Sequence, residues 1–215
     1  MTTTLDAKLD SIENLKWYPW IGNEYNKTKL LILGESHYED GDFWQEGNKN
    51  TTRVITQKRV DDINGKWTLH RNVEKITLNK TDISLDERKN LWNSVSYWNL
   101  VQRLLDSRNE TDRPTDDDFD LGWKLFFEIY EILEPKYCLV LGKAPYGRLG
   151  NYLNNCQNEW QTISSELYPK EKIFKLKNKD KSLTLIFINH PSGSRGFDFQ
   201  KWAEIFNNEF VELVL

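Results

Sequence analysis

Four short apolar runs recur along the chain, and each of them has the length of a strand. They cover residues 29–33, 91–99, 137–142 and 182–189. Runs that are this short and almost unbroken are typical of strands buried on both faces of a parallel sheet. The second run ends with Val95, Tyr97 and Asn99 in alternation, so we expect that strand to end on an asparagine.

Apolar residues at helical spacing fill the intervals between these runs. The clearest case follows Thr115 and Asp118, which form a capping box of the kind that starts a helix, and it ends before Pro135. Other helices are expected after Thr52, over residues 69–76 and 99–107, through residue 153, and from Asp198 onward. Strands that alternate with helices indicate an α/β protein. We therefore expect a three-layer α/β/α sandwich around a mainly parallel four-stranded sheet, with residues 1–215 forming a single domain.

Two further segments have a distinctive composition. Residues 17–25, WYPWIGNEY, are rich in aromatic rings, and we expect them to form a strap that packs on the sheet edge. Residues 170–185 carry lysines at nearly every second position around a charged turn. Such a run predicts a solvated hairpin, and it also offers contacts to phosphates that do not depend on base sequence.

Composition narrows the class of protein. The net charge of -4 and the pI near 5.5 exclude a protein coated in positive charge, but not one with a local basic face. Cys138 and Cys156 form no CxxC pair and have no histidine at metal spacing, so we expect reduced thiols and no metal or other cofactor. Neither a leader nor a long apolar run is present, and the glycine motifs of dinucleotide and P-loop sites are missing. We expect a cytoplasmic protein that does not bind a membrane.

Polar and ionisable residues gather where two of the expected strands end, within LLILGESHY and LIFINHPSGSR. The first group consists of Gly34, Glu35, Ser36, His37, Tyr38 and Asp40, and the second of His190, Ser192, Ser194, Arg195 and Phe197. The carboxyl ends of parallel strands line the ligand crevice of an open α/β sheet. We therefore expect the two groups to face each other across one site.

Other polar residues leave alternatives open. Asn99 either caps the following helix or offers its amide to a ligand such as a base edge. Lys143 follows the third strand and either reaches a phosphate or is simply solvated. His70 fits a surface or capping histidine better than a catalytic one. The insertion at residues 41–90 is expected to lie over the carboxyl edge of the sheet and to shape specificity.

The chain resembles the uracil-DNA glycosylase superfamily at four places in the order of that family's motifs. These places are the loop at residues 34–38, Asn99, the segment VLGKAP at residues 140–145, and HPS at residues 190–192. It also resembles a less studied branch that shares PWIGNEY, LILGESHY, SVSYWN and RPTDDDF. Some glycosylases of this superfamily remove modified pyrimidines from phage DNA in antiviral defence.

The resemblance implies a monofunctional DNA glycosylase that flips a base out of DNA and hydrolyses its N-glycosidic bond without a cofactor. His190 would donate to the departing base, Asn99 would read it beside Tyr97, and the loop at residues 34–38 would hold the water. Ser192, Ser194, Arg195 and Phe197 would grip phosphate or wedge into the gap in the duplex. We expect DNA as the partner and a monomeric protein.

This chain departs from the best known branch of the family in its first loop. That branch orients the water with an aspartate two residues after the loop glycine, whereas Ser36 stands there in this chain. Glu35 is therefore our first candidate for positioning water, followed by His37 and Asp40. Tyr38 matches a tyrosine that excludes 5-substituted bases, so the identity of the excised base stays open.

Two other classes of function compete with a glycosylase that acts on modified bases, beside ordinary repair of uracil. A serine hydrolase with Ser36 as its nucleophile needs an acidic partner three residues before His190, where Phe187 stands. A catalytically silent DNA-binding module of the same fold would not need so many ionisable groups at one strand edge.

Overall fold

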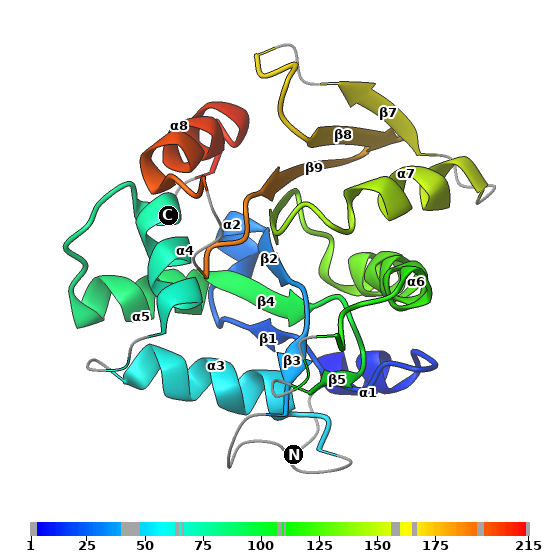
Figure 1. Cartoon of the computed structure of the whole chain (residues 1–215), viewed down its shortest axis with the longest axis horizontal. Coiled ribbons are helices and arrows are strands. Elements are labelled where there is room, and N and C mark those ends of the chain that lie inside the picture. Colours follow the sequence, from blue (N-terminus) through cyan, green and yellow to red (C-terminus); the bar gives the residue numbers. More distant parts are fainter. Residues whose placement is uncertain are drawn as a thin grey trace.

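In the computed structural model, helices pack against both faces of one twisted sheet (Figure 1). The structure describes residues 4–39, 48–62, 65, 67–106, 109, 111–155, 160–164, 167–192 and 196–213. The helices are α1 (Thr4–Asp10), α2 (Tyr25–Thr28), α3 (Thr51–Asp61), α4 (Thr68–Leu78), α5 (Leu85–Ser94), α6 (Asp116–Leu133), α7 (Tyr146–Asn155) and α8 (Phe199–Glu209). The strands are β1 (Trp20–Ile21), β2 (Leu30–Gly34), β3 (His37–Tyr38), β4 (Val95–Asn99), β5 (Leu104–Leu105), β6 (Tyr137–Leu141), β7 (Gln161–Ser164), β8 (Ile173–Asn178) and β9 (Lys181–Ile188).

The main sheet is mixed and has seven strands in the order β1-β4-β2-β6-β9-β8-β7. The four predicted strands β4, β2, β6 and β9 are its parallel centre, and the α/β class is confirmed. The prediction of a four-stranded sheet is wrong, because β1, β8 and β7 add antiparallel strands at the two edges. Edge strands have a solvated side, so their mixed polar sequences lack the continuous apolar run that marks the central strands.

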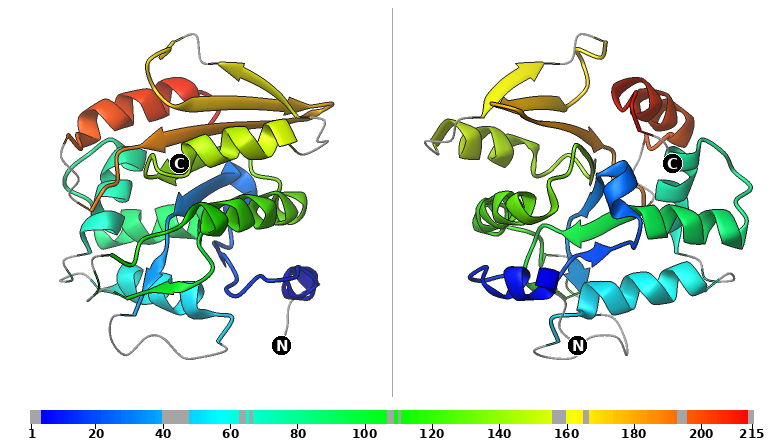
Figure 2. Two further views of the ribbon diagram at one scale, coloured as in Figure 1. Left: turned by 45° about the vertical axis from the view of Figure 1, so that its right-hand side comes forward. Right: turned by 180° about the vertical axis from the view of Figure 1, so that it is seen from behind.

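The two faces of the sheet bury separate sets of side chains because residues alternate along each central strand. In β2, Leu31 and Leu33 pack against α1, α6 and α7, whereas Leu30 and Ile32 pack against α3, α4, α5 and α8. The two groups of helices lie on opposite sides of the strands in all views (Figures 1 and 2). The sheet is thus covered by helices on each face.

Capping sets where the helices begin. The capping box of Thr115 and Asp118 is present at the start of α6, as the sequence predicts, and Ser84 with Glu87 forms a second one at α5. Helix α5 continues to Ser94, so the second strand begins at Val95 instead of residue 91. Leu91 and Trp92 belong to the buried face of this helix. A short apolar run alone does not show whether its residues form a helix or a strand.

The predicted helix over residues 99–107 does not form. The backbone N–H groups of Leu100 and Val101 instead donate to the carbonyls of Gly34 and Glu35, at 3.0 and 2.8 Å. Farther on, β5 pairs with β3 in a small parallel sheet. The extended conformation prevails because the turn after β2 needs partners for its buried carbonyl groups. Asn99 therefore caps no helix, and its side chain lies at the carboxyl end of β4.

The segment at residues 17–25 packs on the sheet edge as expected. Within it, β1 pairs with β4, and the Trp98 indole donates to the carbonyl of Trp17 at 3.0 Å. Gln102 accepts from the backbone N–H groups of Lys16 and Trp17 and donates to the carbonyl of Asn99. This glutamine joins the strap to the end of β4.

The lysine-rich segment forms the hairpin of β8 and β9, which extends the sheet in Figure 2. Because β9 is parallel to β6, the turn between Asn178 and Lys181 lies at the amino edge of the parallel strands. Lys175 and Lys181 form ion pairs with Glu209 and Glu131, at 2.8 and 2.5 Å. These charges are therefore neutralised within the protein and lie away from the opposite, carboxyl edge. Among the described helices, none is long and apolar enough to cross a membrane.

The order of the parallel strands determines where a ligand crevice can form. The chain runs from β2 outward to β4 and then returns across β2 to β6, so the direction of winding reverses between β2 and β6. In an open α/β sheet the crevice lies outside the carboxyl ends of the strands at such a reversal. The residues that follow β2, β4, β6 and β9 are the ones that meet there.

Candidate active site

One cavity lies at this carboxyl edge. Its volume is about 450 Å³, within the range of about 300–1,000 Å³ that is usual for small-molecule sites. The loop after β2, the ends of β4 and β9, and parts of α3 and α4 contribute to its wall. The lining residues are Glu35, Ser36, His37, Tyr38, Ile55, Arg59, Trp67, Thr68, Leu69, His70, Tyr97, Asn99, His190 and Ser192. The two residue groups that the sequence predicts to face each other therefore line one cavity.

Glu35 and His190 come together above the end of β6. A Cβ atom built on Gly142 would lie 3.6 Å from Cδ2 of His190 and 3.9 Å from Oε2 of Glu35. Gly142 has φ of +132°, a conformation that L side chains rarely adopt, so glycine lets β6 end in this turn beneath the two groups. The end of β6 thus lies beside both a carboxylate and an imidazole.

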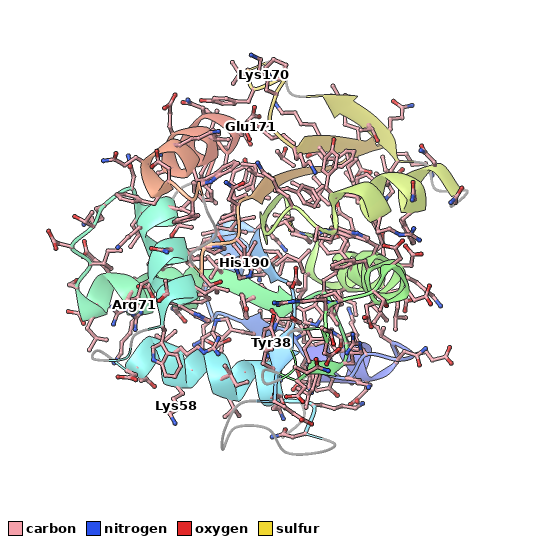
Figure 3. The ribbon with its side chains drawn as sticks, viewed as in Figure 1. Tyr38, Lys58, Arg71, Lys170, Glu171 and His190 are labelled. Atoms are coloured by element: carbon pink, nitrogen blue, oxygen red, sulfur yellow. The ribbon has the colours of Figure 1, made fainter. Side chains whose placement is uncertain are left out.

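Hydrogen bonds set the tautomer of His190. Its Nδ1 lies 2.7 Å from Oγ of Ser192 and accepts from the backbone N–H of Ser192 at 3.4 Å. A ring nitrogen that accepts a hydrogen bond carries no proton, so Nε2 carries the N–H of the neutral ring. Burial lowers the pKa of His190 below its ordinary value. At neutral pH the residue is therefore an uncharged imidazole with Nε2–H as its donor. Figure 3 shows His190 near the centre of the molecule, with Tyr38 below it.

Asn99 and Tyr97 form an oriented pair on β4. The Tyr97 hydroxyl donates to Oδ1 of Asn99 at 2.8 Å, and the asparagine is only 2% exposed. Oδ1 keeps a second lone pair and the amide nitrogen carries two N–H groups, so Asn99 offers both an acceptor and a donor to a ligand in the cavity. Gly34 on β2 makes room for this pair, because a Cβ there would lie 2.1 Å from Oδ1 of Asn99. A side chain at position 34 would displace the asparagine.

The carboxyl group of Glu35 is desolvated. Burial raises the pKa of Glu35 above its ordinary value, and the nearby Arg113 guanidinium opposes that shift. A carboxylate with a raised pKa is a stronger base than an exposed one, as a group that accepts a proton from water should be. Ser36 beside it has a buried hydroxyl that makes no hydrogen bond to a described residue, so none of the described side chains is placed as its base.

His37 stabilises the position of the loop after β2. The ring is 5% exposed, its Nε2 lies 2.9 Å from Oγ1 of Thr52, and its edge packs on Trp17. Burial lowers the pKa of His37 to about 3, with a smaller contribution from the Arg59 charge. This histidine is therefore neutral and joins the loop to the first turn of α3.

The insertion at residues 41–90 contributes one wall of the cavity. The sequence predicts its place over the carboxyl edge of the sheet but not which of its residues face the cavity. Arg59 comes from α3, Trp67 precedes α4, and His70 lies in the first turn of α4. The expectation of a surface or capping role for His70 is wrong, since the ring is 1% exposed and stacks on Trp92 with centroids 5.0 Å apart. His70 stands three residues before Val73, a spacing that places both on the buried face of α4, and this spacing could have predicted its burial.

The remaining predicted site residues lie outside the cavity or at its margin. Lys143 does not line it, because its ammonium group pairs with Glu171 at 3.5 Å and lies over the Trp202 ring. Phe197 is half-buried and packs against the core on the α8 side of the sheet. Ser192 is exposed at the rim. Three predicted residues lie outside the described residues: Asp40, Ser194 and Arg195.

The loop after β9 is tied to the α4 wall. The side-chain amide of Asn72 donates to the carbonyl of Pro191 at 2.7 Å, and this bond links the loop that carries His190 to α4. Within the described parts of the chain, no three His, Cys, Asp or Glu side chains are grouped as a metal ion would require. No protein-family model matches the chain, and no curated protein matches it in sequence.

Proposed function

We propose that this protein is a monofunctional DNA glycosylase that binds a flipped pyrimidine in the cavity and hydrolyses its N-glycosidic bond. The observation that carries the proposal is the convergence of Glu35, Asn99 and His190 on one cavity of about 450 Å³ at the carboxyl edge of the parallel strands. Chemistry on an extruded base needs a group that reads the base, a donor for the leaving base and a group that positions water. These three side chains can supply those functions.

Asn99 is suited to reading the base. Its orientation is fixed by Tyr97, so a substrate meets a preset amide donor at the end of β4. A preorganised donor costs little entropy when the substrate binds. The Tyr97 ring beneath it gives the base an apolar surface within the same cavity.

His190 is suited to stabilising the departing base. As the C1′–N1 bond breaks, its electron pair moves onto the base and negative charge develops on the base oxygens. The Nε2–H of neutral His190 donates to such an oxygen without having to give up its proton. Donors placed where charge develops are worth about 100- to 1,000-fold in rate.

Glu35 completes the reaction. Its carboxylate orients a water molecule toward C1′ of the oxocarbenium-like sugar and accepts a proton from that water as the new C–O bond forms. The base anion then takes up a proton, so one water is consumed and a base and an abasic sugar are released. The negative charge of the carboxylate also stabilises the positively charged sugar before water adds.

The experiment is an incubation with oligonucleotides that contain uracil, other deaminated bases, or hydroxymethylated and glucosylated cytosine, followed by alkali to cut abasic sites. We expect cleavage of one of these in single- or double-stranded form. His190→Ala and Asn99→Ala should each lower the rate by about 100-fold or more. Lys27→Ala is the control, because Lys27 lies on α2 at the opposite edge of the sheet and is 70% exposed.

The pH dependence of kcat/KM tests the roles of Glu35 and His190 in the reaction. Acid removes both active forms, namely ionised Glu35 and neutral His190. The raised pKa of Glu35 moves the loss of its carboxylate to higher pH, whereas the lowered pKa of His190 keeps its ring neutral to lower pH. We expect kcat/KM to fall as pH decreases, and the Glu35→Gln variant to lose the part of that decline that belongs to the carboxylate. Full activity of the His190→Ala and Asn99→Ala variants would disprove the assignment of these residues.

A DNA-binding module without catalysis is the second candidate. It would bind oligonucleotides and leave every base in place, with an intact His190. A serine hydrolase has less support, since Ser36 has no hydrogen-bonded base among the described residues and Phe187 is buried in the core. Repair of uracil and removal of modified cytosine from phage DNA are distinguished by which oligonucleotide is cut.

A further inference from the structure

Arg59 differs from the arginines around it. Arg53 pairs with Asp6 at 2.6 Å, and Arg71 pairs with Glu74 at 2.6 Å. Arg59 lines the cavity, and no carboxylate among the described residues forms an ion pair with it. A half-buried guanidinium offers five N–H donors, so a cavity wall that leaves them without an acidic partner favours a ligand with acceptor oxygens.

The position of Arg59 is determined by its neighbours. The guanidinium lies over the Trp67 ring, 5.3 Å from its centroid. The Trp67 indole N–H donates to Oδ2 of Asp62 at 3.0 Å, which orients the ring. A cation stacked on an indole loses less freedom when it binds a ligand than a solvated one does.

His70 adds a second unsatisfied group to the same wall. The ring is held between Trp92 and Tyr97, and Nε2 is buried without a hydrogen-bond partner. Buried polar atoms without partners are rare in folded proteins, so each of them calls for a specific explanation. The ring itself lines the cavity.

The cavity has more room than a plain base requires. Its volume of about 450 Å³ corresponds to roughly 15 waters of about 30 Å³ each, whereas a pyrimidine base has about eight heavy atoms. This space remains with the Tyr38 side chain in place, since Tyr38 is part of the lining. A base that reaches Asn99 and His190 therefore leaves volume toward α3 and α4.

We propose that Arg59, Trp67 and His70 form a subsite for an oxygen-bearing substituent on the flipped pyrimidine, with a carboxylate as its strongest ligand. The inference rests on the glycosylase function proposed above and names its substrate class as enlarged pyrimidines. Arg59 donates to the oxygens of the substituent, Trp67 holds the guanidinium in place, and His70 provides a further hydrogen bond. Asn99 and His190 keep their roles toward the ring and the scissile bond.

The test compares oligonucleotides that carry 5-carboxycytosine, 5-hydroxymethylcytosine or unsubstituted cytosine. We expect the wild-type protein to prefer them in that order in kcat/KM, because the first substituent is anionic and the second is neutral. Arg59→Met should lower the ratio of substituted to unsubstituted rates by about tenfold or more. His70→Phe keeps the stack on Trp92 and should lower the ratio by a smaller factor. Lys58→Met is the matched control on α3, where Lys58 is exposed and outside the cavity lining (Figure 3).

The outcomes separate the subsite from the proposed function. Base release with an unchanged ratio in Arg59→Met, or with equal losses on all three oligonucleotides, would overturn the subsite while the glycosylase function stands. If the wild-type protein releases no base, the subsite is judged by calorimetry with 5-carboxy-2′-deoxycytidine and 2′-deoxycytidine. A preference for the carboxylated nucleoside that Arg59→Met abolishes supports the subsite. The lack of any preference overturns it.

Discussion

Two glycines determine how closely the catalytic candidates approach one another. Gly142 permits the turn after β6, and Gly34 leaves space for the Asn99 amide and the Tyr97 hydroxyl. Neither contributes a functional group, yet each fixes where functional groups of other strands can lie. Such positions control geometry through the volume that they leave empty.

Gly34→Ala tests this directly. The added Cβ would lie 2.1 Å from Oδ1 of Asn99 and 2.6 Å from the Tyr97 hydroxyl, so the pair must shift. We expect a destabilisation of about 1–3 kcal/mol and a loss of activity of about 100-fold, measured by urea unfolding and base release. Gly147→Ala is the control: it lies in α7 with no atom within 4 Å of the new Cβ, and it should stabilise the protein by about 0.5–1 kcal/mol.

The sequence was sufficient to predict that residues at the ends of the central strands lie at one site. Glu35, Asn99 and His190 each come directly after an apolar run, so the general behaviour of parallel sheets predicts where they meet. Arg59 and His70 come from helices in a polar insertion. Whether their side chains face the cavity depends on how α3 and α4 dock on the sheet. Local periodicity does not determine that docking.

One buried carboxylate links α4 to α5. Glu74 accepts hydrogen bonds from Arg71, Arg88 and the Trp92 indole, at 2.6, 3.2 and 3.0 Å. The Trp92 ring in turn stacks on His70. This network therefore connects the packing of two helices to the cavity wall.

Glu74→Gln should destabilise the protein by about 3–5 kcal/mol, because it leaves Arg88 with its charge buried and its partner neutral. Chemical unfolding measures the effect. Glu24→Gln is the matched control, since its pair with Lys27 is solvent-exposed and contributes at most about 1 kcal/mol. Equal stabilities of the two variants would mean that the buried network does not stabilise the docking of α4 on α5.

Secondary structure was predictable where one physical cause dominates. Thr115 and Asp118 start α6 because a local capping box needs no tertiary contact. Residues 99–107 were mispredicted as a helix because Leu100 and Val101 bond to the turn at Gly34 and Glu35, and that partner is distant in sequence. The edge strands β1 and β7 were not predicted as strands, whereas β8 belongs to the hairpin that the lysine-rich run predicts.

Burial of two histidines links the stability of the whole fold to pH. His37 and His70 are both neutral in the folded state, and burial lowers the pKa of His37 to about 3 and that of His70 well below 6.5. In the unfolded chain both would titrate near 6.5, so the unfolded state binds more protons at acidic pH. The contribution of these neutral histidines to the free energy of unfolding is present above about pH 6.5 and is lost as pH falls toward their folded-state pKa.

Acid should therefore destabilise the protein before its carboxylates titrate. Between about pH 7 and about pH 5, His37 should remove about 2 kcal/mol from the free energy of unfolding, and His70 should lower it in the same direction. The raised pKa of Glu35 acts in the opposite sense and offsets part of this loss. Urea unfolding at the two pH values should show that His37→Gln reduces the difference by about 2 kcal/mol and that His70→Phe also reduces it. If both variants leave the pH dependence unchanged, other groups than these histidines bind the protons that are taken up on unfolding.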